Sequence, residues 1–214
     1  MTGAITGRPR GSAAVTRSGV VDVSVLPSYA YGHRSLMWWG TMGVMAIEGM
    51  VFALAVGTYL YLRTRVDTWP PALPPPDLRW GVVNTLVLLA SAIPNHWTKR
   101  AAEREDLRSV RIGIVVCLAF AVVFLIVRIL EFSTLNCRWD SNAYGSAVWM
   151  LMGLHTTHLI TDAADSVILA VLMFTGPLEG KRFVDVSENA IYWYFVVFAW
   201  LPIAAIVYLA PRLL

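Results

Sequence analysis

The stretch IGIVVCLAFAVVFLIVRILEF, residues 112–132, carries no charge until Arg128 and is apolar almost throughout. A helix needs about 20 such residues to cross the ~30 Å hydrocarbon core of a bilayer. No water is available there to pair with backbone N–H and C=O groups, so a single spanning segment has to be helical. The stretch therefore predicts a transmembrane helix.

Four more apolar segments flank it. The expected transmembrane helices are 36–62, 80–97, 112–132, 145–174 and 190–209, and the second only just reaches the required length. Residues 1–35 contain no apolar core of signal-peptide length and are interpreted as a cytoplasmic N-terminal tail. The predicted fold class is an all-α membrane protein, with residues 36–214 forming a bundle of five transmembrane helices.

The composition supports the same class. Apolar residue types make up 57% of the 214 residues and charged types 14%, whereas soluble domains contain about half and about a quarter. The mean hydropathy is +0.60, which excludes a soluble globule and a disordered chain. In such a chain, the net charge of +3 is a topology signal and does not indicate nucleic-acid binding.

The basic residues give an expected orientation. More Lys and Arg residues lie in the tail and in the loops that follow the second and fourth segments than on the opposite side. Basic loops favour the cytoplasmic side. We expect a multi-pass protein of the bacterial cytoplasmic (inner) membrane, with its N-terminus cytoplasmic and its C-terminus periplasmic.

Glu48 lies near the centre of the first segment. A charge at that depth costs about 2.5–3.5 kcal/mol on insertion scales. The carboxyl group must therefore be protonated, hydrogen-bonded inside a protein interface or paired. It is either a structural acid that joins two helices or an acid linked to protons or lipid.

The fourth segment carries His155, His158, Asp162 and Asp165 at steps of three, four and three residues. At about 100° per residue these four side chains share one face, here called the polar stripe. The stripe cannot face lipid, and each carboxylate can accept from an imidazole one turn away. A hydrogen-bond network or a partner face is the main interpretation. A metal site is the alternative, although no third ligand is obvious.

Arg128 and Glu131 close the third segment. Arg side chains near a helix end extend toward the interface, so we expect an ion pair at the outer membrane surface. A lipid-headgroup site is the alternative.

Several short motifs occur in a fixed order and together resemble subunit III of the haem–copper oxidases, the cytochrome c oxidase family. The resemblance covers about residues 38–208. The motifs are Ala46–Phe52 (AIEGMVF), Trp69-Pro70-Pro71, Asn84–Ser91 (NTLVLLAS), Glu131-Phe132, Gly153–His158 (GLHTTH), Tyr192–Phe195 (YWYF) and Trp200.

The sequence also departs from the family pattern. Many members have seven helices, and the first two are missing here, as in five-helix members. In the last segment, Tyr194 and Val197 replace the usual His and Asp, and Thr156 replaces a common Gly. The roles of the replaced His and Asp therefore cannot be carried over.

The resemblance implies a subunit without haem or copper, which are expected in the partner subunits I and II. It implies direct packing on subunit I, structural phospholipid, cytochrome c as electron donor to the complex, and support of proton uptake and of turnover stability. No catalytic residue is expected in this chain. The residues expected to be buried or linked to lipid or partners are Glu48, Arg128, Glu131, His155, His158, Asp162 and Asp165.

Two other interpretations stay open. The same fold serves in quinol oxidases and nitric oxide reductases, so the sequence does not name the electron donor. The second interpretation is a small proton-linked transporter that uses Glu48 and the polar stripe. Five helices without an internal repeat do not fit the common transporter architectures.

Overall fold

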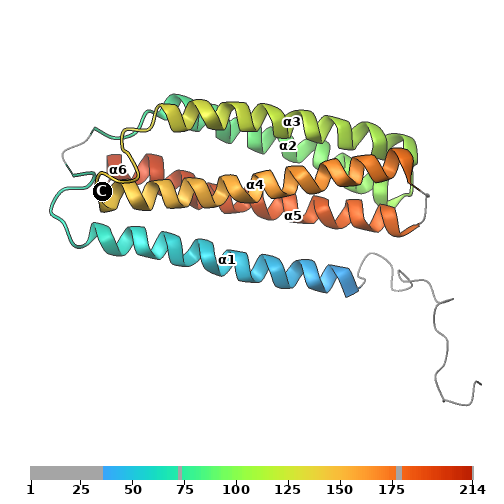
Figure 1. The fold of residues 1–214 in the computed structure, drawn as a ribbon, viewed down its shortest axis with the longest axis horizontal. Helices are drawn as coiled ribbons and strands as arrows, with labels where there is room; N and C mark the ends of the chain where they lie inside the picture. The colour runs from blue at the N-terminus through green and yellow to red at the C-terminus, as the bar shows by residue number, and fades with distance from the viewer. Residues whose placement is uncertain (1–35, 72–73, 177–179, 214) are drawn as a thin grey trace, which may run out of the picture.

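Five long helices run side by side in the computed structural model, which describes residues 36–71, 74–176 and 180–213 (Figure 1). The expected N-terminal tail, residues 1–35, lies outside the described residues. The elements are α1 (Leu36–Arg63), α2 (Leu78–Glu103), α3 (Leu107–Ser133), α4 (Ala143–Thr175), α5 (Gly180–Ala204), the π-helical turn η1 (Ala205–Leu209) and α6 (Ala210–Leu213). The predicted bundle of five long helices is confirmed for this part of the chain.

The helices form layers. α1 packs against α4 and α5, while α2 and α3 pack against each other on the opposite side of the α4–α5 pair (Figure 1). α1 is therefore the outermost helix, and α4 and α5 separate it from α2 and α3.

Three helix boundaries differ clearly from the prediction, and one of them is the start of α3 at Leu107 instead of residue 112. α2 continues to Glu103 instead of ending at residue 97, and α5 begins at Gly180 instead of residue 190. Lys99 and Arg100 therefore lie inside α2, and Lys181 and Arg182 lie in the first turn of α5. The reason is that charged side chains end an apolar window, but their helix propensity lets the helix continue into the aqueous layer.

Aspartate side chains fix the starts of two helices. Asp77 accepts a hydrogen bond from the backbone N–H of Arg79 at 2.9 Å. Asp106 accepts from the hydroxyl of Ser109 at 2.5 Å and from its N–H at 3.3 Å. The Ser109 hydrogen bonds hold the pKa of Asp106 below its usual value, because they stabilise the ionised carboxylate.

Four of the helical stretches described are long and apolar enough to cross a membrane: Met37–Arg63, Leu107–Ser133, Ala143–Thr175 and Gly180–Leu213. α2 has the length, but it carries Asn84, Ser91, Asn95 and Thr98, all of which are buried. The packing explains its polarity, because these groups face the other helices of the bundle instead of lipid.

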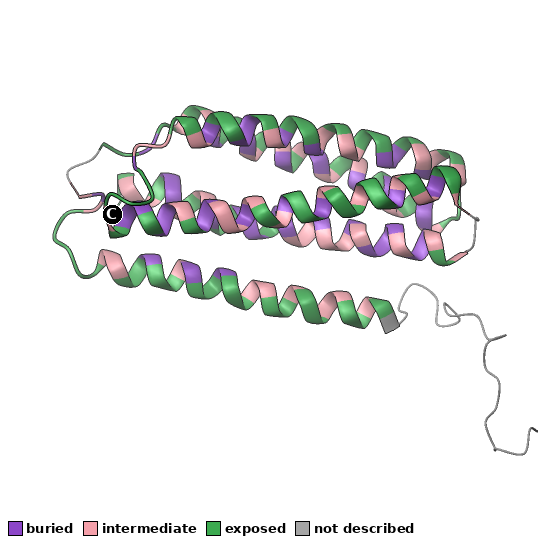
Figure 2. Cartoon of the chain, viewed as in Figure 1, coloured by how far each residue is buried: buried purple, intermediate pink, exposed green. Residues whose placement is uncertain are grey.

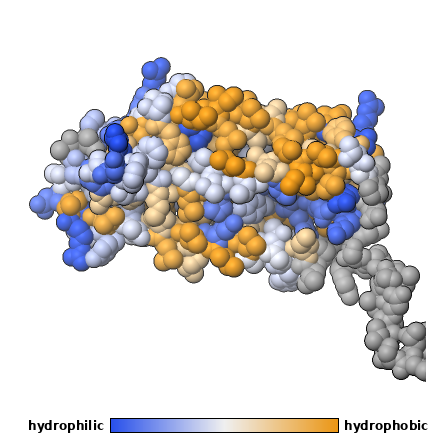
Figure 3. Space-filling view, viewed as in Figure 1, coloured by the Kyte–Doolittle hydropathy of each residue, from blue (hydrophilic) through white to orange (hydrophobic). Residues whose placement is uncertain are grey.

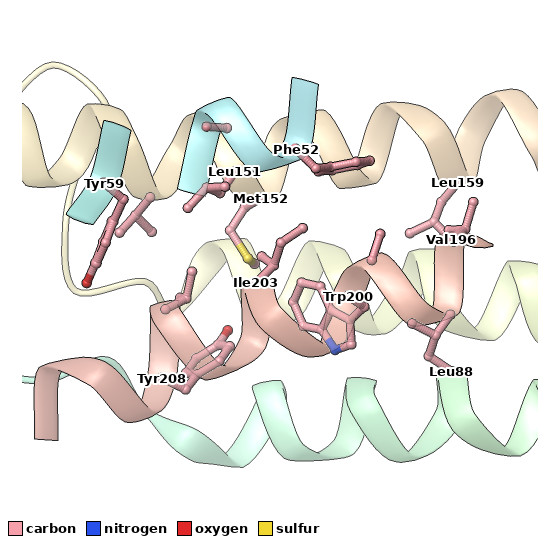
Figure 4. Packing of buried hydrophobic residues seen from close by; sticks show 14 of the residues in the cluster. Phe52, Tyr59, Leu88, Leu151, Met152, Leu159, Val196, Trp200, Ile203 and Tyr208 are labelled. Carbon is pink, nitrogen blue, oxygen red and sulfur yellow. The ribbon is translucent and has the colours of Figure 1, made fainter. Parts of the chain in front are cut away.

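The largest hydrophobic cluster fills the bundle from α1 to η1 (Figures 2 and 4). The Trp200 side chain is fully buried at its centre, with Met152 and Ile203 beside it (Figure 4). A smaller cluster around Ala102, Val110 and Met173 joins the other ends of α2, α3 and α4. The ion pair described below is embedded in the large cluster, which contains Phe124, Trp200 and Tyr208.

Glycine allows two close approaches. A Cβ atom on Gly113 of α3 would lie 2.2 Å from Oγ1 of Thr98 on α2, and one on Gly81 would lie 2.5 Å from the Tyr208 ring. No L side chain fits at such distances, so α2 owes its tight contact with α3 and with η1 to these two residues.

The outer surface is rich in apolar side chains. Hydrophobic patches cover much of the face seen in Figure 3, and hydrophilic groups lie at its two ends. Ile93 is 74% exposed and Phe198 is 71% exposed. A large exposed apolar surface with polar ends is what a bundle surrounded by lipid or by membrane partners requires.

Candidate functional site

An ion pair lies inside the bundle. Nη1 of Arg128 is 2.8 Å from Oε2 of Glu131, and each side chain is 1% exposed. Glu131 also accepts a hydrogen bond from Nδ2 of Asn84 on α2 at 2.5 Å and another from the Tyr208 hydroxyl on η1. Side chains of α2, α3 and η1 therefore meet at the Glu131 carboxylate.

The Arg128 guanidinium has further partners. It lies over the Trp200 ring at 4.2 Å and over the Phe124 ring at 4.9 Å from the ring centroids, where the negative face of an aromatic ring attracts a cation. Its Nη2 is 3.1 Å from Nδ1 of His155. We call these residues, Asn84, Phe124, Arg128, Glu131, His155, Trp200 and Tyr208, the buried network.

The hydrogen bonds settle the protonation of His155. Nε2 lies 3.1 Å from the carbonyl oxygen of Val196, which only accepts, so Nε2 must carry a proton. Nδ1 faces Arg128, which only donates, so Nδ1 must be an acceptor. His155 is therefore a neutral imidazole with both nitrogen atoms engaged.

The expected ion pair between Arg128 and Glu131 forms, and its location at the outer membrane surface stays a prediction. Both side chains are buried. The physical reason is that Tyr208 of η1, Asn84 and Trp200 cover this part of α3. The buried partners stabilise both charges in place of water.

A second polar group lies between α1, α4 and α5. The Tyr192 hydroxyl donates to Oε2 of Glu48 at 2.7 Å, and Nε2 of His158 lies 3.5 Å from Oε1 of the same carboxyl. The Phe52 ring packs on His158 with centroids 4.9 Å apart. We call Glu48, His158 and Tyr192 the Glu48 cluster.

The Glu48 cluster differs from the buried network in its exposure. The side chain of Glu48 is 24% exposed and that of His158 is 12% exposed. Nδ1 of His158 lies 2.7 Å from the carbonyl oxygen of Leu154 and must donate to it. Nε2 of His158 is therefore the ring nitrogen left to face the Glu48 carboxyl group, 3.5 Å away.

The two aspartates of the polar stripe both accept hydrogen bonds from Asn189. Nδ2 of Asn189 on α5 donates to Asp162 at 3.2 Å and to Asp165 at 3.3 Å, and the Ser166 hydroxyl donates to Oδ1 of Asn189 at 3.2 Å. Asp162 is buried and Asp165 is exposed.

The polar stripe does not act as one unit. We expected its aspartates to accept from its histidines, but His155 pairs with Arg128, His158 with Glu48, and the aspartates with Asn189. The reason is that a helical face about 80° wide touches three neighbouring helices here, and each residue pairs with the nearest one. Local spacing places side chains on a face but does not choose their long-range partners.

Four polar partners are missing from the sequence prediction of the site: Asn84, Asn189, Tyr192 and Tyr208. Asn84 carries a usable signal, because an amide within an apolar segment needs a buried partner. The two tyrosines carry a weaker one, since tyrosine also serves as an interfacial anchor.

Within 36–71, 74–176 and 180–213, no group of three or more His, Cys, Asp or Glu side chains is arranged to hold a metal ion. The buried network pairs its charges and joins helices. The Glu48 cluster places an acid, an imidazole and a phenol together in a partly exposed position.

A family model described as cytochrome c oxidase subunit III matches residues 64–211. The match begins directly after α1 and covers the buried network, the polar stripe and Tyr192. More than half of the chain is thus described by one family.

Curated relatives agree with the family match. A cytochrome c oxidase subunit 3 of Thermostichus vulcanus is 24% identical over 192 residues, covering 88% of this chain and 94% of that protein. A protein of Mycobacterium tuberculosis named "Probable cytochrome c oxidase subunit 3" is 27% identical over 205 residues, covering 92% and 98%. A heme-copper oxidase subunit I+III of Aeropyrum pernix is 25% identical over 186 residues, covering 82% of this chain and 22% of that longer protein.

The family match and the four helices that can cross a membrane describe a multi-pass membrane protein. The relatives align along nearly their full length with this chain, apart from the longer I+III protein. The chain belongs to the cytochrome c oxidase subunit III family.

Proposed function

We propose that this chain is the non-redox subunit III of a terminal haem–copper oxidase in a bacterial cytoplasmic membrane. The complex passes electrons from cytochrome c to oxygen and couples this to proton translocation. Haem and copper belong to subunits I and II, and this chain packs on subunit I, orders phospholipid and supports proton uptake.

The observation that carries the proposal is the buried network. Its two charged groups, Arg128 and Glu131, are bound by one another and by side chains of α2, α4, α5 and η1. A site built in this way stabilises a bundle and leaves little of its charge for a substrate. It suits a subunit that supports its neighbours without taking part in electron transfer.

The Aeropyrum pernix relative supports subunit I as the partner. Its name joins subunits I and III in one protein, and this chain aligns with 22% of it. Fusion keeps two polypeptides at high effective concentration, which suits domains that pack together.

The Glu48 cluster and the apolar surface support the phospholipid and proton roles. Glu48 and His158 are partly exposed and lie 3.5 Å apart. The neighbouring residues Ile47, Met50 and Val51 of α1 are exposed and apolar. Lipid or another subunit at this surface would keep water from the carboxyl group, and would make its proton exchange depend on that neighbour.

Two experiments test the function and the topology. In a blue-native gel of solubilised membranes, we expect this chain to migrate with larger haem-containing subunits in a band with cytochrome c oxidase activity. Oxidation of quinol instead of cytochrome c, or reduction of nitric oxide, would assign the chain to one of those relatives. Migration alone would contradict the proposal and favour a transporter.

For the topology, single cysteines introduced near residues 105 and 180 are labelled from each side of the membrane. We expect both to react from the cytoplasmic side, because the basic residues favour that side. Labelling from outside would reverse the proposed orientation.

A further inference from the structure

A small cavity lined by both polar and apolar side chains lies between α2, α3, α4 and α5, apart from the buried network and the Glu48 cluster. The volume open to the centre of a water molecule is about 30 Å³, and one water needs about 10–15 Å³ by the same measure. The cavity therefore has room for about two waters. Asp162, Asn95, Asn189 and Cys117 line it, together with hydroxyl groups.

Most hydrogen-bond donors around the cavity are already engaged. The hydroxyls of Ser91 and Thr98 donate to backbone carbonyls at 2.6 and 2.8 Å. The Ser166 hydroxyl donates to Asn189, and the Asn189 amide donates to both aspartates. The Trp193 indole N–H donates to Ser91. These groups therefore leave few hydrogen-bond donors free to point into the cavity.

Acceptors remain available. Asn95 uses its Nδ2 to donate to the carbonyl of Ala190 at 2.9 Å, and its Oδ1 accepts no hydrogen bond from the described residues. Asp162 accepts from Asn189 through Oδ1 only. Both side chains are more than nine-tenths buried. An acceptor-rich cavity needs an occupant that donates, because unpaired buried oxygen atoms are unfavourable.

The charges around Asp162 also favour a donor. The titratable groups that face it are Cys117 of α3, Asp165 of α4 and Tyr192 of α5, and the α2 residues of the lining are Ser91, Asn95 and Thr98. No Lys or Arg side chain among the described residues lines the cavity. An ionised carboxylate without a cation is strongly unfavourable at such a position.

We propose that this cavity is a proton-binding site, in which Asp162 is held as a neutral carboxylic acid by one or two ordered waters. Oδ2 of Asp162 carries the proton and donates it into the cavity. The waters donate to Oδ1 of Asn95 and to the remaining hydroxyl lone pairs. The occupant supplies the donors that the side chains lack.

Asn189 connects this site to the surface. Its amide bridges buried Asp162 and exposed Asp165, so a proton taken up at Asp165 lies one side chain away from the cavity. The inference rests on this geometry alone and stands whether or not the oxidase function is correct.

The direct test is a high-resolution density map of the intact complex that contains this chain. We expect one or two peaks within hydrogen-bond distance of Oδ2 of Asp162 and Oδ1 of Asn95, with spacings typical of water. An empty cavity would overturn the proposal. One strong peak with short contacts to five or six oxygen atoms, dependent on sodium in the buffer, would also overturn it and indicate a cation site.

The second test is infrared difference spectroscopy of the same complex during exchange from H₂O to D₂O at neutral pH. We expect a carboxylic-acid C=O band that shifts on exchange, that is lost in Asp162→Asn and that persists in the matched control Asp165→Asn. A band unchanged in Asp162→Asn would show that Asp162 is ionised, which contradicts the proposal even if the map contains water. If Asp162→Asn does not assemble, an empty cavity in the wild-type map would still overturn the proposal.

Discussion

The buried network and the Glu48 cluster both place an acid, a histidine and a tyrosine between helices, yet the two groups differ in how far their side chains are exposed. In the buried network, Glu131 and Arg128 are each 1% exposed and His155 is fixed as one neutral tautomer. In the Glu48 cluster, the acid is 24% exposed and lies 3.5 Å from His158. Similar residues are therefore sealed inside the bundle in one place and left partly exposed in the other.

The largest effect is expected from breaking the buried ion pair. Arg128→Met leaves Glu131 charged and without its cation, which costs about 3–5 kcal/mol. The double variant Arg128→Met/Glu131→Met removes both charges and should be markedly more stable than the single variant. Thermal denaturation of the purified complex, followed by release of this chain, measures both. Equal loss in the two variants would show that the ion pair is not the determinant.

The next effect concerns the α2–α3 contact at Gly113 and Thr98, about 20 Å along α2 from the Asn84–Glu131 hydrogen bond. Gly113→Ala forces a Cβ atom to 2.2 Å from Oγ1 of Thr98, and overpacking of this kind costs about 1–3 kcal/mol. Gly57→Ala is the matched control, because no atom lies within 4 Å of its added Cβ. The same denaturation assay should separate the two. A stable Gly113→Ala complex would mean that α2 and α3 shift apart freely.

A smaller effect on stability, but a specific effect on function, is expected at the Glu48 cluster. Glu48→Gln keeps an acceptor for the Tyr192 hydroxyl and removes the only group of this side chain that can bind or release a proton. Because the side chain is partly exposed, we expect a stability change within about 0.5 kcal/mol, a near-normal initial oxygen uptake and a shorter active lifetime. Tyr192→Phe is the control that keeps the carboxyl. An equal loss of lifetime in both would assign the effect to the hydrogen bond instead of the proton.

The smallest effect lies outside both groups, at the start of α3. The pKa of Asp106 is lowered in the folded chain by the hydrogen bonds from Ser109. Its stabilisation is therefore present above the unfolded value of 3.8 and is lost as the pH falls through the lower folded value. Asp106→Asn should be slightly less stable than the wild type at pH 7 and lose less stability as the pH falls from 5 to 3, so that the two curves converge. Melting curves across that range check it, and parallel curves would contradict it.

The sequence predicted the helices better than their contacts. The apolar run of α3 fixes a membrane helix by itself, because lipid leaves the backbone no other structure. The predicted length of α2 was too short, because Lys99 and Arg100 ended its apolar window. The helix continues to Glu103, since these residues have a high helix propensity. The buried polar groups of α2 also show why its composition resembles that of a membrane helix so weakly.

Within the site, spacing identified the acids and histidines but not their partners. The i, i+3 step predicted the Arg128–Glu131 pair correctly, since both residues lie on one helix. Its burial depends on Tyr208, 77 residues from Glu131, and no local pattern contains that information. The contact of His158 with Glu48 likewise joins α4 to α1, so only the packing of the bundle decides it.

The central claim is that this chain supports an oxidase without carrying its electrons, and oxygen uptake over many turnovers tests it most directly. The complex is assayed with this chain, after its removal and after its return, together with haem reduction. We predict near-normal initial uptake after removal, a faster decay during turnover and recovery of the lifetime when the chain is returned. Immediate and complete loss of haem reduction, with the remaining subunits still folded, would contradict the account.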